Sequence, residues 1–134
     1  MKNRFLFLIP VLVLIDQLIK YLVKDRIFII FNQPLILYSK NTGAAFGILA
    51  GNNLLLIFIS VLVLILLGYF YKKEPKLRIG LAFIFAGAIS NLMDRVFRGF
   101  IVDYINIWIL SNFNLADVFN ILGLLLILYK LKGK

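Results

Sequence analysis

Residues 91–117 read NLMDRVFRGFIVDYINIWILSNFNLAD and hold half of the six acidic residues of an otherwise strongly apolar chain. The stretch contains three aspartates and four asparagines: Asp94, Asp103, Asp117, Asn91, Asn106, Asn112 and Asn114. An ionisable side chain in or beside a membrane segment costs free energy, so its presence indicates a functional site by default. We therefore expect this stretch to connect two membrane helices and to carry the chemistry of the protein.

The composition around that stretch is typical of an integral membrane protein. Of the 134 residues, 63% are hydrophobic and the mean hydropathy is +1.00, whereas an average soluble domain has roughly 45–50% apolar residues. The chain has no cysteine and no histidine, which removes disulfides, thiolate catalysis, cysteine-ligated metal and the usual general base of serine hydrolases. We expect carboxylate chemistry that needs no metal and no organic cofactor.

The net charge of +9 does not indicate a nucleic-acid partner, because the basic residues are not interleaved with stacking aromatic residues on a soluble face. They cluster at the ends of the apolar runs. Nine of the fifteen lie near one side, where only Glu74 offsets them: Lys2, Arg4, Lys72, Lys73, Lys76, Arg78, Lys130, Lys132 and Lys134. The positive-inside rule makes this side cytoplasmic and therefore predicts a multi-pass membrane protein with both termini in the cytoplasm.

Four apolar runs predict an all-α membrane protein with four transmembrane helices, in a single domain over residues 1–134. The runs cover residues 5–23, 54–71, 78–97 and 113–131, and about 19 residues at 1.5 Å per residue cross a hydrocarbon core of roughly 30 Å. A cleavable signal peptide is the alternative for the first run. However, Asp16, Gln17 and Lys20 follow without a small-residue cleavage site, so we expect a retained helix.

Residues 24–53, between the first two runs, break the helical pattern. Two short β-branched and aromatic segments, IFIIF and LILYS, flank Asn32, Gln33 and Pro34, which predicts a β-hairpin outside the membrane. The segment NTGAAFG follows at residues 41–47. Its small residues leave the backbone uncovered and suit the close approach of a peptide or lipid; an ordinary loop is the alternative.

Polar residues within the first and third runs are spaced to share helix faces. Asp16 and Lys20 are four residues apart, which suits an internal ion pair of either structural or functional importance. Asn91, Asp94 and Arg95 are spaced i, i+3 and i+4 near the end of the third run. Such a face must look towards protein or water rather than lipid.

Asp103 follows the third run, and Asp117 lies near the outer end of the fourth, on one helical face with Asn114. The topology lets these two carboxyls converge, where repulsion and desolvation leave one protonated acid beside one carboxylate, as in an aspartic protease. Two alternatives stay open. Asp103 can be a solvated loop residue with Asp117 complementing a helix dipole, or the chain can be a small proton-coupled transporter that uses Asp16.

Four motifs, in this order, resemble those of bacterial lipoprotein signal peptidase, also called signal peptidase II. They are DQLIK at residues 16–20, NTGAAFG at 41–47, GAISNLMDRVFRGFIVDYI at 87–105 and FNLAD at 113–117. The resemblance covers essentially the whole chain. It implies an intramembrane aspartic endopeptidase that removes the signal peptide from diacylglyceryl-modified prolipoproteins, N-terminal to the lipidated cysteine. It also implies a small extracytoplasmic β-cradle and inhibition by the cyclic peptide globomycin.

By motif position, the resemblance assigns the catalytic dyad to Asp103 and Asp117. It assigns substrate or inhibitor contacts to Asn41, Gly43, Arg95 and Asn114. It assigns supporting positions near the site to Asp16, Lys20, Asn91 and Asp94. The implied partners are the diacylglyceryl-prolipoprotein and membrane lipids, with the active site towards the extracytoplasmic leaflet. The segment after Asp117 reads VFNILG, which departs from the more polar continuation of some family members.

Overall fold

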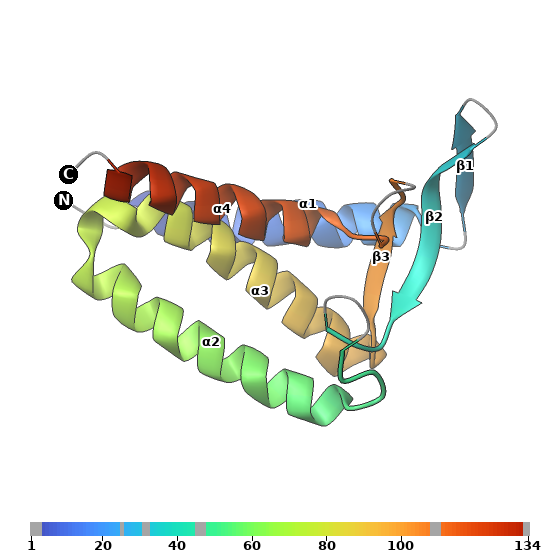
Figure 1. Cartoon of the computed structure of the whole chain (residues 1–134), viewed down its shortest axis with the longest axis horizontal. Helices are drawn as coiled ribbons and strands as arrows, with labels where there is room; N and C mark the ends of the chain where they lie inside the picture. The colour runs from blue at the N-terminus through green and yellow to red at the C-terminus, as the bar shows by residue number, and fades with distance from the viewer. Residues whose placement is uncertain (1–3, 25, 31–32, 45–47, 108–110, 133–134) are drawn as a thin grey trace.

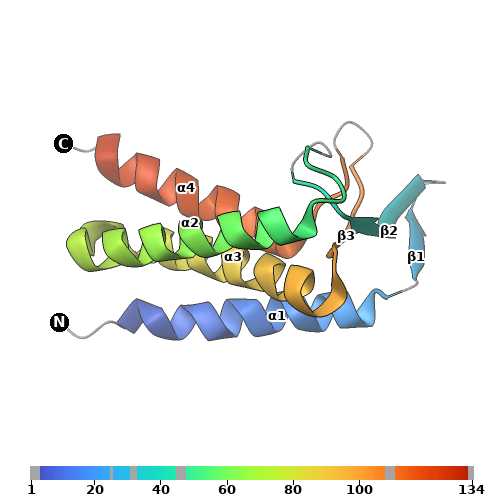
Figure 2. The same ribbon diagram turned by 90° about the horizontal axis from the view of Figure 1, so that it is seen from below.

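The computed structural model describes residues 4–24, 26–30, 33–44, 48–107 and 111–132, and it places four helices side by side with a small sheet across one end (Figure 1). In chain order the elements are η1 Arg4–Phe7, α1 Leu8–Leu22, β1 Ile27–Ile30, β2 Gln33–Asn41, α2 Asn53–Lys73, η3 Pro75–Leu77, α3 Arg78–Arg98, β3 Ile101–Ile105 and α4 Leu115–Lys132. The start of α1, the end of α4 and the turn between α2 and α3 lie at the end opposite the sheet (Figures 1 and 2).

Among the described residues, three helices are long and apolar enough to cross a membrane. These segments are Phe5–Leu22, Asn53–Lys73 and Pro75–Arg98, with mean hydropathies of 2.0, 2.8 and 1.4. The fourth helix, α4, has 18 residues but carries Asp117 in its first turn and two lysines in its last turn. The chain is therefore a mostly helical membrane protein as predicted, whereas the fourth transmembrane span stays a prediction.

Helix α3 is the central helix, packing against α1, α2 and α4. Its contact with α4 is backbone to backbone, because a Cβ atom placed on Gly80 would lie only 2.7 Å from the carbonyl oxygen of Gly123. Helix α2 packs mainly on α3 and leaves large apolar side chains such as Leu54 and Ile65 exposed. Exposed apolar faces of this kind suit a lipid environment.

The sheet has three antiparallel strands in the order β1-β2-β3. Strands β1 and β2 confirm the predicted hairpin, although residues 31–32 of its turn lie outside the described residues. The sequence predicted only a connection between two membrane helices here, without the strand β3. It forms because Gly99, with a φ of 80°, ends α3 in a left-handed conformation, and the following residues then pair with β2, placing Asp103 opposite Ser39.

Candidate active site

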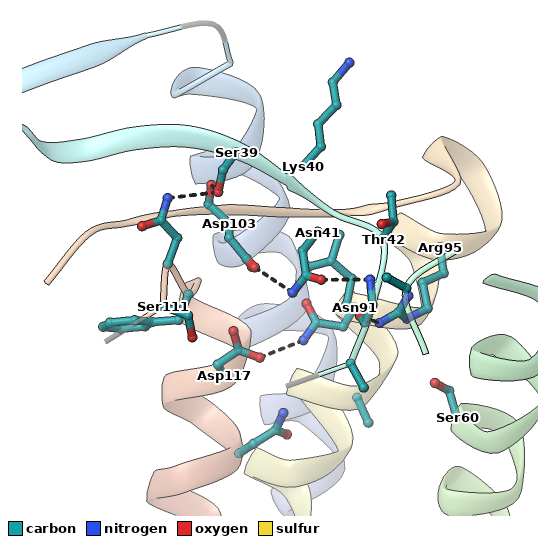
Figure 3. Close-up of a pocket in the computed structure, with 18 of the residues that line it drawn as sticks. Ser39, Lys40, Asn41, Thr42, Ser60, Asn91, Arg95, Asp103, Ser111 and Asp117 are labelled. Carbon is teal, nitrogen blue, oxygen red and sulfur yellow. Dashed lines mark hydrogen bonds between the residues drawn. The ribbon is translucent and has the colours of Figure 1, made fainter. Parts of the chain in front are cut away.

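Asp103 lies on β3 and points into the space between the sheet and the helices (Figure 3). Its Oδ2 atom accepts a hydrogen bond of 2.9 Å from Nδ2 of Asn41 on β2, and its Oδ1 atom accepts one of 2.7 Å from Nδ2 of Asn114. The residue is only 3% exposed. The alternative that Asp103 is a solvated loop residue was therefore wrong.

The environment of Asp103 has a direct electrostatic consequence. Burial raises the pKa of Asp103 to about 6, and the charge of Asp117 adds to that increase, while the amide donors of Asn41 and Asn114 and the charge of Lys20 oppose it. Desolvation disfavours the ionised form of any carboxyl, whereas donated hydrogen bonds favour it. Asp103 can therefore gain or lose a proton close to neutral pH.

Asp117 lies in the first turn of α4. Its Oδ1 atom accepts a hydrogen bond of 3.0 Å from Nδ2 of Asn91 on α3. Its Oδ2 atom accepts one of 3.1 Å from the main-chain N–H of Asn114, whose own Oδ1 atom accepts from the main-chain N–H of Asp117 at 3.0 Å. This reciprocal arrangement is a capping box, and it fixes the orientation of the carboxylate at the helix end.

Asn114 is the side chain that connects the two acids. It is fully buried, and its amide group donates to Asp103 while its carbonyl group caps the N–H of Asp117. The prediction that Asn114 and Asp117 share a helical face was wrong, because α4 begins at Leu115 and Asn114 precedes it. An asparagine at this position supplies the acceptor that the first N–H groups of a helix lack, which explains where the helix starts.

A second group of polar residues lies behind the two acids and is centred on Lys20. Its Nζ atom is 2.8 Å from Oδ2 of Asp16 and 2.8 Å from Oδ2 of Asp94, and all three side chains are fully buried. We call Asp16, Lys20 and Asp94 the ionic cluster. The ion pair of Asp16 with Lys20 was predicted from their spacing, whereas the pairing of Lys20 with Asp94 was not.

The carboxylates of the ionic cluster are enclosed by further donors. Asp16 accepts from the Ser90 hydroxyl at 2.5 Å and from the main-chain N–H of Ala116 at 3.1 Å. Asp94 accepts from Gln17 at 3.0 Å and from Arg98. Because both oxygens of Asp16 have partners within the protein, the geometry argues against a transporter in which Asp16 carries protons across the membrane.

Asn91 links the ionic cluster to the two acids. Its Oδ1 atom accepts a hydrogen bond of 3.1 Å from Nζ of Lys20, while its Nδ2 atom donates to Asp117. The lysine charge therefore orients the asparagine amide with its donor end towards Asp117. Through Asn91, the ionic cluster positions the carboxylate of Asp117, which it does not contact itself.

Asp103 and Asp117 both line a cavity of about 820 Å³. Four other predicted site residues also line it: Asn41, Gly43, Asn91 and Arg95. The cavity walls come from the edge of the sheet, from the segment after β2 and from α2, α3 and α4 (Figure 3). Asp16, Lys20, Asp94 and Asn114 do not line the cavity, so the structure places Asn114 behind the acids rather than at a substrate-contacting position.

Residues 41–44 of the segment NTGAAFG line this cavity, and residues 45–47 lie outside the described residues. The Asn41 side-chain oxygen accepts from the main-chain N–H of Gly43 at 3.0 Å, and Nη2 of Arg95 donates to the Gly43 carbonyl at 2.6 Å. The buried Nη1 atom of Arg95 has no hydrogen-bond partner among the described residues. An unpaired guanidinium donor beside a cavity is available to an acceptor on a ligand.

Several cavity residues were missed by the sequence analysis, among them Ser39, Ser60 and Asn120. Ser39 belongs to the predicted hairpin, and Ser60 lies in an otherwise apolar helix. Asn120 follows Asp117 by three residues, so helical spacing already places both on one face. That spacing was the one signal that could have identified Asn120.

The sequence and structure resemble those of known proteins. A family model for signal peptidase (SPase) II matches residues 8–132. Lipoprotein signal peptidase of Halothermothrix orenii is 40% identical over 129 residues, covering 89% of each chain, and that of Moorella thermoacetica is 34% identical, covering 95% of this chain and 91% of its own. A solved bacterial membrane enzyme at 2.3 Å resolution is 32% identical and superposes with a TM-score of 0.84, over 96% of this chain and 87% of its own.

Proposed function

The chain belongs to the signal peptidase II family, and on that basis we propose that it is an aspartic endopeptidase that removes the signal peptide from diacylglyceryl-modified prolipoproteins. The cut falls on the N-terminal side of the lipidated cysteine. One observation carries the aspartic assignment: Asp103 and Asp117 line the same cavity and share Asn114 as a hydrogen-bond partner. The membrane location and the protease activity follow from the family.

The two acids divide the work of amide hydrolysis between them. The ionised member takes a proton from a water molecule as the water oxygen bonds to the scissile carbonyl carbon, and the protonated member donates to the carbonyl oxygen. When the C–N bond breaks, a proton passes to the leaving amine and the original protonation is restored. A pKa of about 6 for Asp103 suits this exchange near neutral pH.

The cavity lining supports an extended peptide bound between the sheet and the helices. The wall nearest the sheet offers main-chain groups around Gly43 and the free donor of Arg95, which suit a peptide backbone. On the membrane side, Ala88 and Ile121 leave a mainly apolar wall. The diacylglyceryl chains of the substrate stay in lipid against the exposed apolar faces of the helices.

The proposed orientation follows from charge. In one domain over residues 1–134, four spans place both termini and residues 72–76 in the cytoplasm of a bacterial cell, and the cavity at the extracytoplasmic leaflet. A reporter inserted in residues 72–76 is expected to show a cytoplasmic location. An external location would overturn this topology without affecting the hydrolytic proposal.

The direct test is cleavage by the purified protein in detergent, without a proton gradient. The substrate is a synthetic prolipoprotein peptide whose cysteine carries a diacylglyceryl group, with the unlipidated peptide as the matched control, and the products are identified by mass spectrometry. We expect a fragment that begins with the lipidated cysteine, and we expect globomycin to block its formation. Absence of cleavage, or cleavage that needs a gradient, would contradict the proposal.

A further inference from the structure

Asn120 is a polar residue of the cavity that the two acids and their partners do not use. It lies on α4 three residues beyond Asp117, about 4.5 Å further from the sheet end at 1.5 Å per residue, and it lines the cavity beside Ala88 and Ile121. Its Oδ1 atom packs against Gly87, where an added Cβ would lie only 2.3 Å away. That atom is buried and has no hydrogen-bond partner among the described residues.

The unpaired side-chain amide of Asn120 lowers the stability of the protein when no substrate is bound. A buried polar atom without a partner loses its hydration and gains nothing in return, and water is scarce on the membrane side of the site. A leucine has nearly the same shape and would avoid that loss. A group kept at a cost to the free protein is best explained by a ligand that pairs with it.

The proposed substrate brings unpaired polar groups to the same place. A signal segment enters the membrane as a helix, and it must unwind around the bond that is cut. Unwinding leaves main-chain N–H groups of the segment without partners, and lipid supplies none. The unpaired Oδ1 atom of Asn120 is an acceptor on the membrane side of the acids, so it can pair with such an N–H group.

We propose that Asn120 is a substrate-binding residue whose side-chain Oδ1 atom accepts a hydrogen bond from a main-chain N–H group of the signal segment, on the N-terminal side of the scissile bond. The inference rests on the proposed function for the identity of the ligand. It adds to that function a contact that selects peptides whose helix is unwound at the level of Asn120. Asn120 takes no part in the proton transfers of Asp103 and Asp117.

The test measures binding of a fluorescent lipidated peptide in the uncleavable Asp103→Asn background, with and without Asn120→Leu. Loss of one neutral hydrogen bond predicts a dissociation constant higher by about 3–10-fold, with thermal stability unchanged or raised. Asn52→Leu is the matched control, because Asn52 is exposed, makes no side-chain cap hydrogen bond and does not line the cavity. Unchanged binding in Asn120→Leu would overturn the inference.

Backbone ester substitution in the peptide separates contact from a structural role. An ester replaces one main-chain N–H group by oxygen and so removes that donor. One ester upstream of the scissile bond is therefore expected to weaken binding to the parent protein but not to add to the Asn120→Leu effect. The proposed contact would be wrong if the effects of the ester and of Asn120→Leu on binding added fully at every upstream position. It would also be wrong if Asn120→Leu lowered the melting temperature. Cleavage by the wild-type protein is scored separately, so failure of the proposed function is recognised independently of this result.

Discussion

Two groups of aspartates, of which only Asp117 is not fully buried, lie close together in this protein, and they differ in the partners that hold them. In the ionic cluster, Asp16 and Asp94 contact the charged Lys20, and Asp94 also pairs with Arg98. Among the described residues, the hydrogen-bond donors to the Asp103 and Asp117 carboxylates are side-chain or main-chain amides. Burial alone therefore does not distinguish a structural carboxylate from a reactive one.

The difference in partners determines how each group responds to substitution. An ammonium group at 2.8 Å holds a buried carboxylate in place, and removing one member of such a buried pair is strongly destabilising. Asn41, Asn91 and Asn114 instead position the two acids with uncharged amide groups.

The largest expected effect is on cleavage activity, and it distinguishes the two groups of aspartates. Asp103→Asn and Asp117→Asn each remove one member of the acid–base pair, and cleavage is expected to fall by about 10²–10⁴-fold or more, with the folded protein retained in the membrane. Asp94→Asn, in the ionic cluster, is expected to lower the melting temperature while keeping measurable activity. Peptide cleavage and thermal unfolding in the same detergent check both statements.

Two outcomes would contradict this assignment of roles to the two groups of aspartates. Cleavage at the wild-type rate by either the Asp103 or the Asp117 variant would remove the acid pair from the mechanism. Complete loss of cleavage in Asp94→Asn with an unchanged melting temperature would place the ionic cluster in the chemistry instead.

The second prediction concerns the lysine of the ionic cluster. Lys20→Met leaves Asp16 and Asp94 buried close to each other without the ammonium group they share, and is expected to cost about 3–5 kcal/mol of stability. The double variant Lys20→Met/Asp94→Asn removes one of the two stranded charges and is expected to recover part of that loss. Denaturation monitored in detergent measures both, and an undiminished stability for Lys20→Met would show that the cluster is dispensable to the fold.

How far the sequence predicted these groups depended on how local each interaction is. Asp16 and Lys20 pair within one helix, so their spacing sufficed. The contact of Lys20 with Asp94 joins two helices that are distant in sequence, and no pattern within either helix shows which faces meet. The strand β3 was missed for the same reason, since its five residues are stabilised by pairing with the distant strand β2.

The third prediction separates the two roles of Asn114, which caps α4 and bridges the acids. Asn114→Ala removes both, and loss of the cap alone is expected to cost about 0.5–2 kcal/mol. Asn114→Ser keeps an oxygen that can accept from the Asp117 N–H but is too short to reach Asp103. We expect serine to restore stability without restoring cleavage; equal rescue of both by serine would show that the bridge to Asp103 is unimportant.

The smallest expected effect is a shift in the titration of Asp103. Because burial raises its pKa from 3.8 to about 6, the folded protein binds more protons than the unfolded chain between these values, and the contribution of Asp103 to stability falls as pH rises through that window. Asn41→Ala removes a donor that favours the ionised form, so it is expected to raise the pKa further. Asp117→Asn removes a neighbouring negative charge and is expected to lower it.

Carbon-13 NMR of aspartate carboxyls in detergent micelles measures these opposite shifts. Ser39→Ala is the control. The Ser39 hydroxyl donates to the main-chain carbonyl of Asp103 at 3.1 Å and accepts from Nδ2 of Asn112 at 3.0 Å, rather than contacting the Asp103 carboxyl, so its loss should leave the titration unmoved. If Asn41→Ala and Asp117→Asn moved the pKa in the same direction, then amide donors and carboxylate repulsion would not be the forces that set it. The proposed role of the asparagine donors at Asp103 would then be wrong.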